Sequence, residues 1–172
     1  MRGFFFGLAF ACLGGLFALT CEAAECANTT EGGSIEGGSL SAKSLPDKVK
    51  NRCISISNAT VEDDLDLSLL GIDEFRADHV TFSGQLLWSP QSENPPSLYV
   101  FNSKLHGNVD LYHGQFGEIE FQNCTFDEQA TFHSITVSNF YLDKSRFDDR
   151  ATFVAMNVSG DLTLADTTFR QN

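Results

Sequence analysis

Positive charge is scarce in this chain. Its 172 residues include 11 Lys and Arg against 23 Asp and Glu, which gives a formal net charge of −12. Proteins that bind nucleic acid or an anionic membrane need clustered basic side chains, so the composition argues against both of these ligands. It remains compatible with basic partners and with cations.

The sequence motifs that usually carry catalysis are also missing. No Gly-rich phosphate loop is present, no serine lies in a nucleophile elbow, and the five Cys form no Cys-x-x-Cys pair. The four His are scattered without metal-ligand spacing; they are His79, His106, His113 and His133. We therefore predict a protein that is not an enzyme, with no catalytic residue and no cofactor.

Tryptophan and tyrosine are rare, whereas phenylalanine is abundant, with 16 Phe against one Trp and three Tyr. Phe is a large side chain without a polar atom, so it suits the centre of a narrow stack. Large apolar residues recur every 21 or 22 positions and form four columns. The columns are Phe121, Leu142 and Leu164; Phe126, Phe147 and Phe169; Phe132 and Phe153; and Val137 and Val158. A fixed period of this length indicates a repeat architecture.

Within each repeat the large apolar residues lie 5 or 6 positions apart, and a small residue often precedes them by two. Residues i−2 and i share one side of an extended strand, whereas an amphipathic helix needs spacings of 3 and 4. The pattern predicts an all-β fold, a parallel β-helix with four short faces and about five to six coils after Ile54. A three-faced parallel β-helix, like that of polysaccharide lyases, is the alternative fold.

The same spacing continues towards the N-terminus. It predicts further inward side chains at Ile56, Val61, Leu67, Ile72, Ala77, Phe82, Leu87 and Phe101. The register breaks only in a proline-containing segment at 89–97. Because proline cannot donate to a strand ladder, this segment is predicted to be an excursion loop.

The central and small residues of the repeat resemble the pentapeptide-repeat family. The matching positions are Phe126, Phe132, Phe147, Phe153 and Phe169 at the centre, with Cys124, Ala130, Ser145, Ala151 and Thr167 two residues earlier. The resemblance covers residues 54–169 and implies a right-handed quadrilateral β-helix. It also implies a homodimer that forms end to end through the C-terminal coil. Six-residue steps and large residues at several small positions depart from the family pattern.

The N-terminal sequence has the features of a leader. Arg2 precedes an uncharged apolar run at 3–19 and then small residues, which predicts a signal peptide at 1–23 and a secreted or periplasmic protein. The alternatives are an uncleaved membrane anchor, or lipidation at Cys21. Gly, Ser and Thr are frequent in the next stretch, which predicts a flexible linker or arm at 24–50, before a repeat domain at 51–172.

Export would place the remaining cysteines in an oxidising compartment. There, a disulfide between Cys26 and Cys53 would tie the linker to the domain. Closing a loop of this size contributes about 3 to 4 kcal/mol in the chain-entropy model. Cys124 lies two residues before a core Phe, so we interpret it as a small buried thiol.

Two acidic pairs occupy equivalent positions one coil apart, namely Asp127 with Glu128 and Asp148 with Asp149. Stacked coils would bring these carboxylates together, and carboxylate oxygens are the ligands that Ca²⁺ prefers. We favour the alternative of a solvated acidic edge without metal, because no Asp-x-Asp-x-Asp-Gly loop is present.

Three functions compete for this chain. We favour an exported, non-catalytic scaffold or protein-interaction module built on an acidic β-helix, whose protein partner the sequence does not identify. The resemblance also implies DNA mimicry that protects topoisomerases, but a signal peptide argues against a cytosolic target. A carbohydrate-active enzyme on a three-faced helix is the third hypothesis. It requires a groove lined with aromatic and acidic residues, whereas most aromatic residues here belong to the inward columns.

Overall fold

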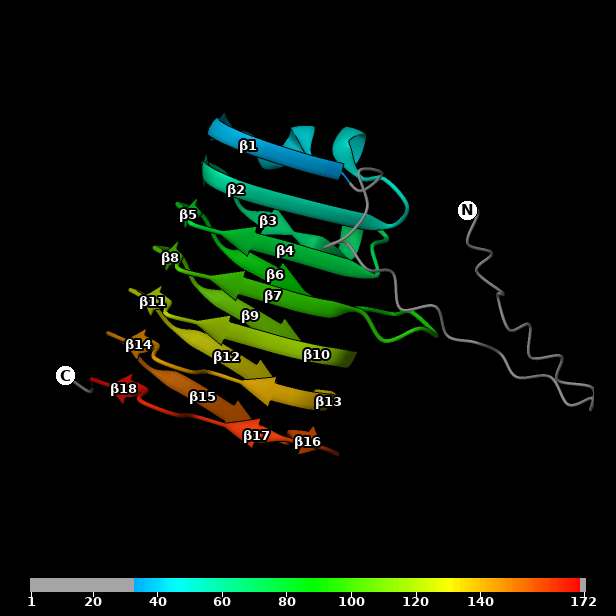
Figure 1. Cartoon of the computed structure of the whole chain (residues 1–172). Coiled ribbons are helices and arrows are strands. Elements are labelled where there is room, and N and C mark those ends of the chain that lie inside the picture. Colours follow the sequence, from blue (N-terminus) through cyan, green and yellow to red (C-terminus); the bar gives the residue numbers. More distant parts are fainter. Residues whose placement is uncertain (1–32, 171–172) are drawn as a thin grey trace, which may run out of the picture.

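Residues 33–170, the part of the chain that the computed structural model describes, form a parallel β-solenoid (Figure 1). Each inner strand pairs in parallel with the strand one turn earlier and the strand one turn later. The predicted all-β parallel helix is therefore confirmed. No helix within these residues is long and apolar enough to cross a membrane.

A full turn has four pairing stations, which we name as walls. The long wall contains β1 (Gly33–Leu40), β2 (Cys53–Val61), β4 (Glu74–Asp78), β7 (Ser97–Phe101), β10 (Gln115–Gln122), β13 (Thr136–Tyr141) and β17 (Leu162–Thr163). The second wall contains β5 (Thr81–Phe82), β8 (Lys104–Leu105), β11 (Thr125–Phe126), β14 (Arg146–Phe147) and β18 (Thr168–Phe169). The third wall contains β3 (Leu65–Asp66), β6 (Leu86–Trp88), β9 (Val109–Tyr112), β12 (Ala130–His133) and β15 (Ala151–Val154). On the short wall, the first residues of β10 and β13 align with β16 (Asn157–Val158).

Large apolar side chains fill the interior of every turn. The ring of Phe147 lies between the rings of Phe126 and Phe169, at centroid distances of 4.2 and 5.0 Å and with nearly parallel planes. Phe132 and Phe153 stack in the same way, 5.0 Å apart. The predicted columns therefore point inward, and in the C-terminal turns Phe stacks on Phe. This continuity makes the core one linear column.

The small residues two positions before the core residues form hydrogen bonds with the backbone at an inner corner. Ser103, Cys124 and Ser145 are buried at equivalent positions of three successive turns. The Ser103 hydroxyl accepts from the N–H of Val80, and the Ser145 hydroxyl accepts from the N–H of Cys124. The Cys124 thiol donates to the carbonyl of Val100 at 3.2 Å. A small side chain is needed here because it must fit beside the backbone that it bonds.

The structure corrects the linker predicted at 24–50, within its described part. Residues 33–40 form β1, which pairs in register with β2, and two short 3₁₀ helices follow, η1 (Ala42–Ser44) and η2 (Pro46–Lys48). The sequence of β1 has little apolar period of its own, so the unpaired edge of β2 is what holds it extended. The sequence predicts about five to six coils; from β2 onward the long wall has six turns, and β1 adds a seventh. Residues 1–32, with the predicted leader and Cys26, lie outside the described residues.

Two inward positions predicted from the spacing are wrong by one residue. In β6 the buried side chains are Leu86 and Trp88, and Leu87 lies on the outer face. In β7 Val100 is buried, and Phe101 points outward. A slip of one residue moves a strand side chain to the other face, and a run of consecutive apolar residues hides such a slip in the sequence.

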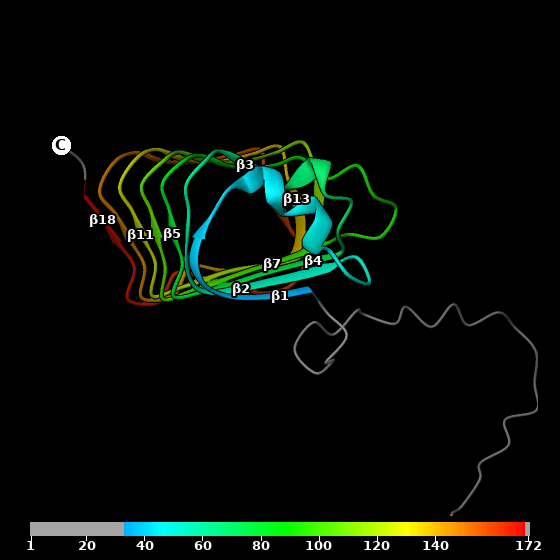
Figure 2. The same ribbon diagram turned by 90° about the horizontal axis from the view of Figure 1, so that it is seen from above.

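The excursion loop predicted at 89–97 occupies residues 89–96, and Ser97 already belongs to β7. Figure 2 looks along the axis of the solenoid, and the loop extends there beyond the outline that the stacked turns share. A third short helix, η3 (Leu67–Leu69), lies in the turn before this loop. The loop therefore adds surface without interrupting the stack.

Candidate binding surfaces

The last turn leaves its apolar side chains uncovered. Phe153, Leu162, Leu164 and Phe169 are between 39% and 57% exposed, although they continue the inward columns. Within the described residues, β15 and β18 each pair with a strand on one side only. We call this face, with its four apolar side chains and its unpaired strand edges, the open end. Contiguous exposed apolar surface of this kind marks an interaction site.

The opposite end of the solenoid is closed. η1 and η2 lie across it (Figure 2) and place Leu45, which is 0% exposed, against the core. Gly33 is packed so tightly there that an added Cβ would lie 1.9 Å from the carbonyl oxygen of Lys48. The segment that the sequence indicated as a linker is therefore the cap of the solenoid.

The outer face of the long wall carries a ladder of charged and aromatic side chains. Arg76, Tyr99, Glu120 and Tyr141 are neighbours in register. Their strands, β4, β7, β10 and β13, lie side by side in Figure 1. The guanidinium carbon of Arg76 lies 4.4 Å from the centroid of the Tyr99 ring. Arg76 Nε also donates to Glu74 Oε1 at 2.9 Å. We call these five residues, together with Glu118, the outer ladder.

The C-terminal half of the outer ladder is negatively charged and partly desolvated. Within residues 33–170, neither Glu118 nor Glu120 forms an ion pair. Burial raises the pKa of the Glu120 carboxyl, and the charges of Glu118 and Asp143 raise it further. Burial also raises the pKa of the Tyr99 hydroxyl. A nearby cation would favour the charged form of Glu120 and so relieve this repulsion.

Sequence reasoning missed the outer ladder. It assigned the aromatic residues to the interior, and most Phe do lie there. Tyr99, Phe101 and Tyr141, however, point outward from β7 and β13, with Tyr99 and Phe101 stacked at a centroid distance of 6.4 Å. The signal that could have found the ladder is the recurrence of Arg76, Tyr99, Glu120 and Tyr141 at equivalent positions of four repeats.

The acidic pairs predicted as a weak metal site do lie one turn apart, since β11 and β14 are neighbours. The first acid of each pair nevertheless has its own basic partner. Asp127 pairs with Nδ1 of His106, and Asp148 Oδ2 accepts from Arg146 Nη2 at 2.7 Å. Arg170 Nη1 lies 3.5 Å from the other oxygen of Asp148. The carboxylates are thus directed to separate bases and do not converge on one point.

The remaining predicted ligands do not converge either. Glu128 and Asp149 are exposed, and the rings of His113 and His133 meet edge to face, with centroids 5.3 Å apart. No group of three or more His, Cys, Asp or Glu side chains that could hold a metal ion occurs in the described part of the chain.

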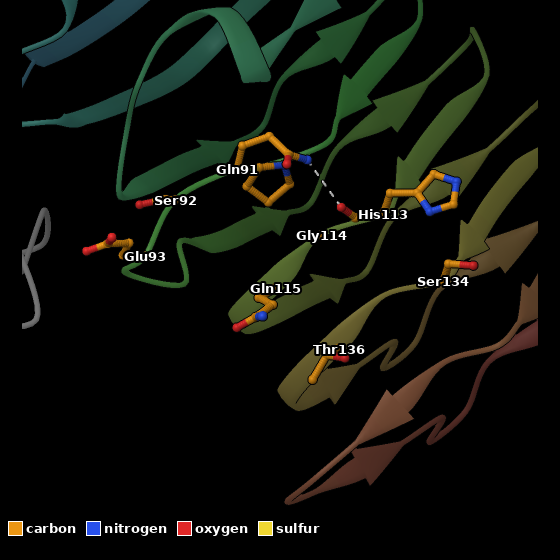
Figure 3. A pocket seen from close by; sticks show the side chains of 9 residues that line it. Gln91, Ser92, Glu93, His113, Gly114, Gln115, Ser134 and Thr136 are labelled. Atoms are coloured by element: carbon orange, nitrogen blue, oxygen red, sulfur yellow. Dashed lines mark hydrogen bonds between the residues drawn. The ribbon is translucent and has the colours of Figure 1, made fainter.

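A polar groove of about 720 Å³ lies between the excursion loop and the neighbouring corner of the solenoid (Figure 3). Its polar lining comprises Gln91, Ser92, Glu93, His113, Gln115, Ser134 and Thr136. Gln91 Nε2 donates to the carbonyl of His113 at 3.4 Å and so joins the two sides. The groove offers hydrogen-bonding groups, but its lining shows no hydrogen bond between a nucleophile and a base.

The two cysteines of the described region differ in state. Cys124 is a buried free thiol, as predicted, and burial raises its pKa to about 12. Cys53 is 3% exposed and is disulfide-bonded. Its predicted partner, Cys26, lies outside the described residues, so this pairing stays a prediction.

Together, these surfaces and the fold define a β-solenoid repeat protein. No family model, no curated protein and no solved structure matches the chain. The resemblance to pentapeptide-repeat proteins accordingly rests on the residues of the repeat alone.

Proposed function

We propose that this protein is an exported, non-catalytic protein-interaction module, built as a divergent pentapeptide-repeat solenoid. The observation that carries the proposal is the open end, where apolar side chains of the last turn are about half exposed. Monomeric proteins rarely expose contiguous apolar surface, and partners commonly cover it. Export rests on the leader sequence at 1–23.

The occupant that fits the open end is a second copy of the same chain. Inside the solenoid, the Phe147 and Phe169 rings already stack 5.0 Å apart, and a second copy would offer an identical ring to Phe169. A two-fold axis through the open ends would set the same four apolar side chains of each copy against each other. The unpaired strand edges would then pair between the two copies.

Sedimentation of the full-length chain over a series of concentrations tests this proposal. We expect a dimer, and we expect Leu162→Asp to weaken self-association about 100-fold, because an unpaired charge would be buried in the interface. The matched control is Leu69→Asp, since Leu69 is 80% exposed on η3, away from the open end. A monomer at all concentrations would contradict the proposal, as would a dimer that both variants leave unchanged.

Cell fractionation tests the exported part of the proposal. We expect a processed chain outside the cytoplasm, because the basic start, apolar run and small residues at 1–23 form a cleavable leader. Recovery of the unprocessed chain from the cytosol would contradict export. That result would return DNA mimicry to consideration, because its target is cytosolic.

A further inference from the structure

We propose that the outer ladder of the long wall is a docking surface for a basic segment of a partner protein, rich in arginine and lysine. This inference rests on the proposed function as an interaction module. The outer ladder would be a second binding surface, on the side of the solenoid and separate from the open end, and its ligand would be positively charged.

The wall already binds one guanidinium, and that contact serves as a template. The Arg76 guanidinium is stacked 4.4 Å from the Tyr99 ring centroid and is paired with Glu74 at 2.9 Å. An aromatic face with a carboxylate beside it is a combination that recognises arginine and, less strongly, lysine. The N-terminal half of the ladder thus shows which group this surface accommodates.

The same combination recurs two strands further on, but there the carboxylates form no ion pair within residues 33–170. Glu120 is the strand neighbour of Tyr99 on one side and of Tyr141 on the other, and Glu118 lies on the same outer face of β10. The next residue of the ladder, on β17, is Thr163, which brings no charge. A basic side chain of a partner would therefore meet two carboxylates and an aromatic face.

Charge complementarity selects a basic polypeptide as the occupant. The chain has a net charge of −12, so its field attracts a basic segment and repels nucleic acid. The charges of two acids, Glu118 and Asp143, raise the pKa of the Glu120 carboxyl, and the charge of one base, Arg76, lowers it. Acids outnumber bases here, and burial weakens their hydration, so a cation brought by a partner gains both charge pairing and relief of repulsion.

Titration calorimetry with the full-length chain and a synthetic peptide of alternating Arg and Ser tests the proposal. We expect binding that weakens as salt is added, and no binding of the same peptide with Gln in place of Arg. The double variant Glu118→Gln/Glu120→Gln should lose about tenfold in affinity. Tyr141→Ser should weaken binding severalfold, whereas Tyr141→Phe, which keeps the ring, should bind like the unmodified chain.

The matched control is the double variant Glu128→Gln/Asp149→Asn, which removes two exposed carboxylates that follow β11 and β14 of the second wall. If both double variants lose affinity equally, net charge alone attracts the peptide, and the proposal is overturned. Absence of binding to the unmodified chain also overturns it. Sedimentation of the ladder variants separates this result from the proposed dimer, because those variants should still self-associate through the open end.

The pH dependence supplies a second readout on the same complex. Protonation removes the negative charge of Glu120, and its raised pKa means that protonation begins at a higher pH than for an ordinary glutamate. Arg peptide binding should therefore weaken as the pH falls, starting above the usual glutamate range, and Glu118→Gln/Glu120→Gln should remove most of this dependence. An unchanged pH profile in that variant overturns the role of the two carboxylates.

Discussion

The two ends of the solenoid both carry large apolar side chains, but they differ in how far these side chains are buried. At the N-terminal end, Leu45 is fully buried beneath η1 and η2. At the C-terminal end, Phe169 stacks on Phe147 in the same inward column, yet it is 45% exposed. A side chain that points into a solenoid is therefore not buried for that reason alone. It is buried when another turn or a cap packs over it. At the closed end, η1 and η2 form this covering layer. At the open end, the described chain packs against the last turn on one side only.

The largest effect should separate an inner ring from an end ring. Phe147→Ala removes a ring held between two others, so we expect a loss of about 3 to 5 kcal/mol in the free energy of unfolding. Phe169→Ala should cost only about 1 to 2 kcal/mol, because its ring is covered on one side. Urea unfolding followed by circular dichroism measures both. Equal losses would show that the last turn is covered in solution.

A smaller effect should test whether the cap stabilises the closed end. Leu45→Ala leaves a cavity under η1 and η2, so we expect a loss of about 2 to 3 kcal/mol in the same urea experiment. Leu69→Ala is the control, because Leu69 is 80% exposed and its truncation should change stability by less than about 0.5 kcal/mol. An unchanged midpoint for Leu45→Ala would mean that the cap is dispensable.

The smallest effect concerns local opening, with Cys124 as the probe. Only the thiolate reacts with iodoacetamide, and a pKa of about 12 keeps this buried thiol protonated at pH 8. Modification must then await opening of the turns above it. Cys124 lies nearer to the open end than to the cap, so Phe169→Ala should speed alkylation severalfold and Leu45→Ala less. Mass spectrometry measures both rates; the reverse order would place the weaker end at the cap.

Most of the core could be predicted from spacing, because each column repeats large apolar residues at a fixed interval. Phe126 and Phe147 lie 21 residues apart, and the structure stacks them at 4.2 Å. The prediction failed where two adjacent residues were both apolar. Val100 lies five residues before Leu105 and 21 before Phe121, whereas Phe101 lies four and 20 before them. The spacing itself therefore favours Val100, and pairing with the neighbouring strands places Val100 inside.

The candidate surfaces were harder to predict than the core. The outer ladder consists of outward residues that each look ordinary in sequence, and its chemistry appears only when β4, β7, β10 and β13 are set side by side. The acidic pairs were predicted to stack and do so, but their basic partners were not foreseen. His106 is 21 residues from Asp127, and Arg170 is 22 from Asp148, so the two partners of each ion pair lie on neighbouring turns.

The sequence alone determined that this chain stacks short parallel strands around a column of Phe, because apolar residues 5 or 6 apart within a period of 21 or 22 fit short strands and not an amphipathic helix. The tertiary structure decided which phase each strand takes, that a Gly- and Ser-rich segment becomes a strand and a cap, and which charges meet on the long wall. The physical reason is that stacking requires a large apolar residue at the same position of every turn, which produces a periodic pattern in the sequence. Edge pairing and charge contacts depend instead on partners a full turn away, so they cannot be predicted from one residue at a time.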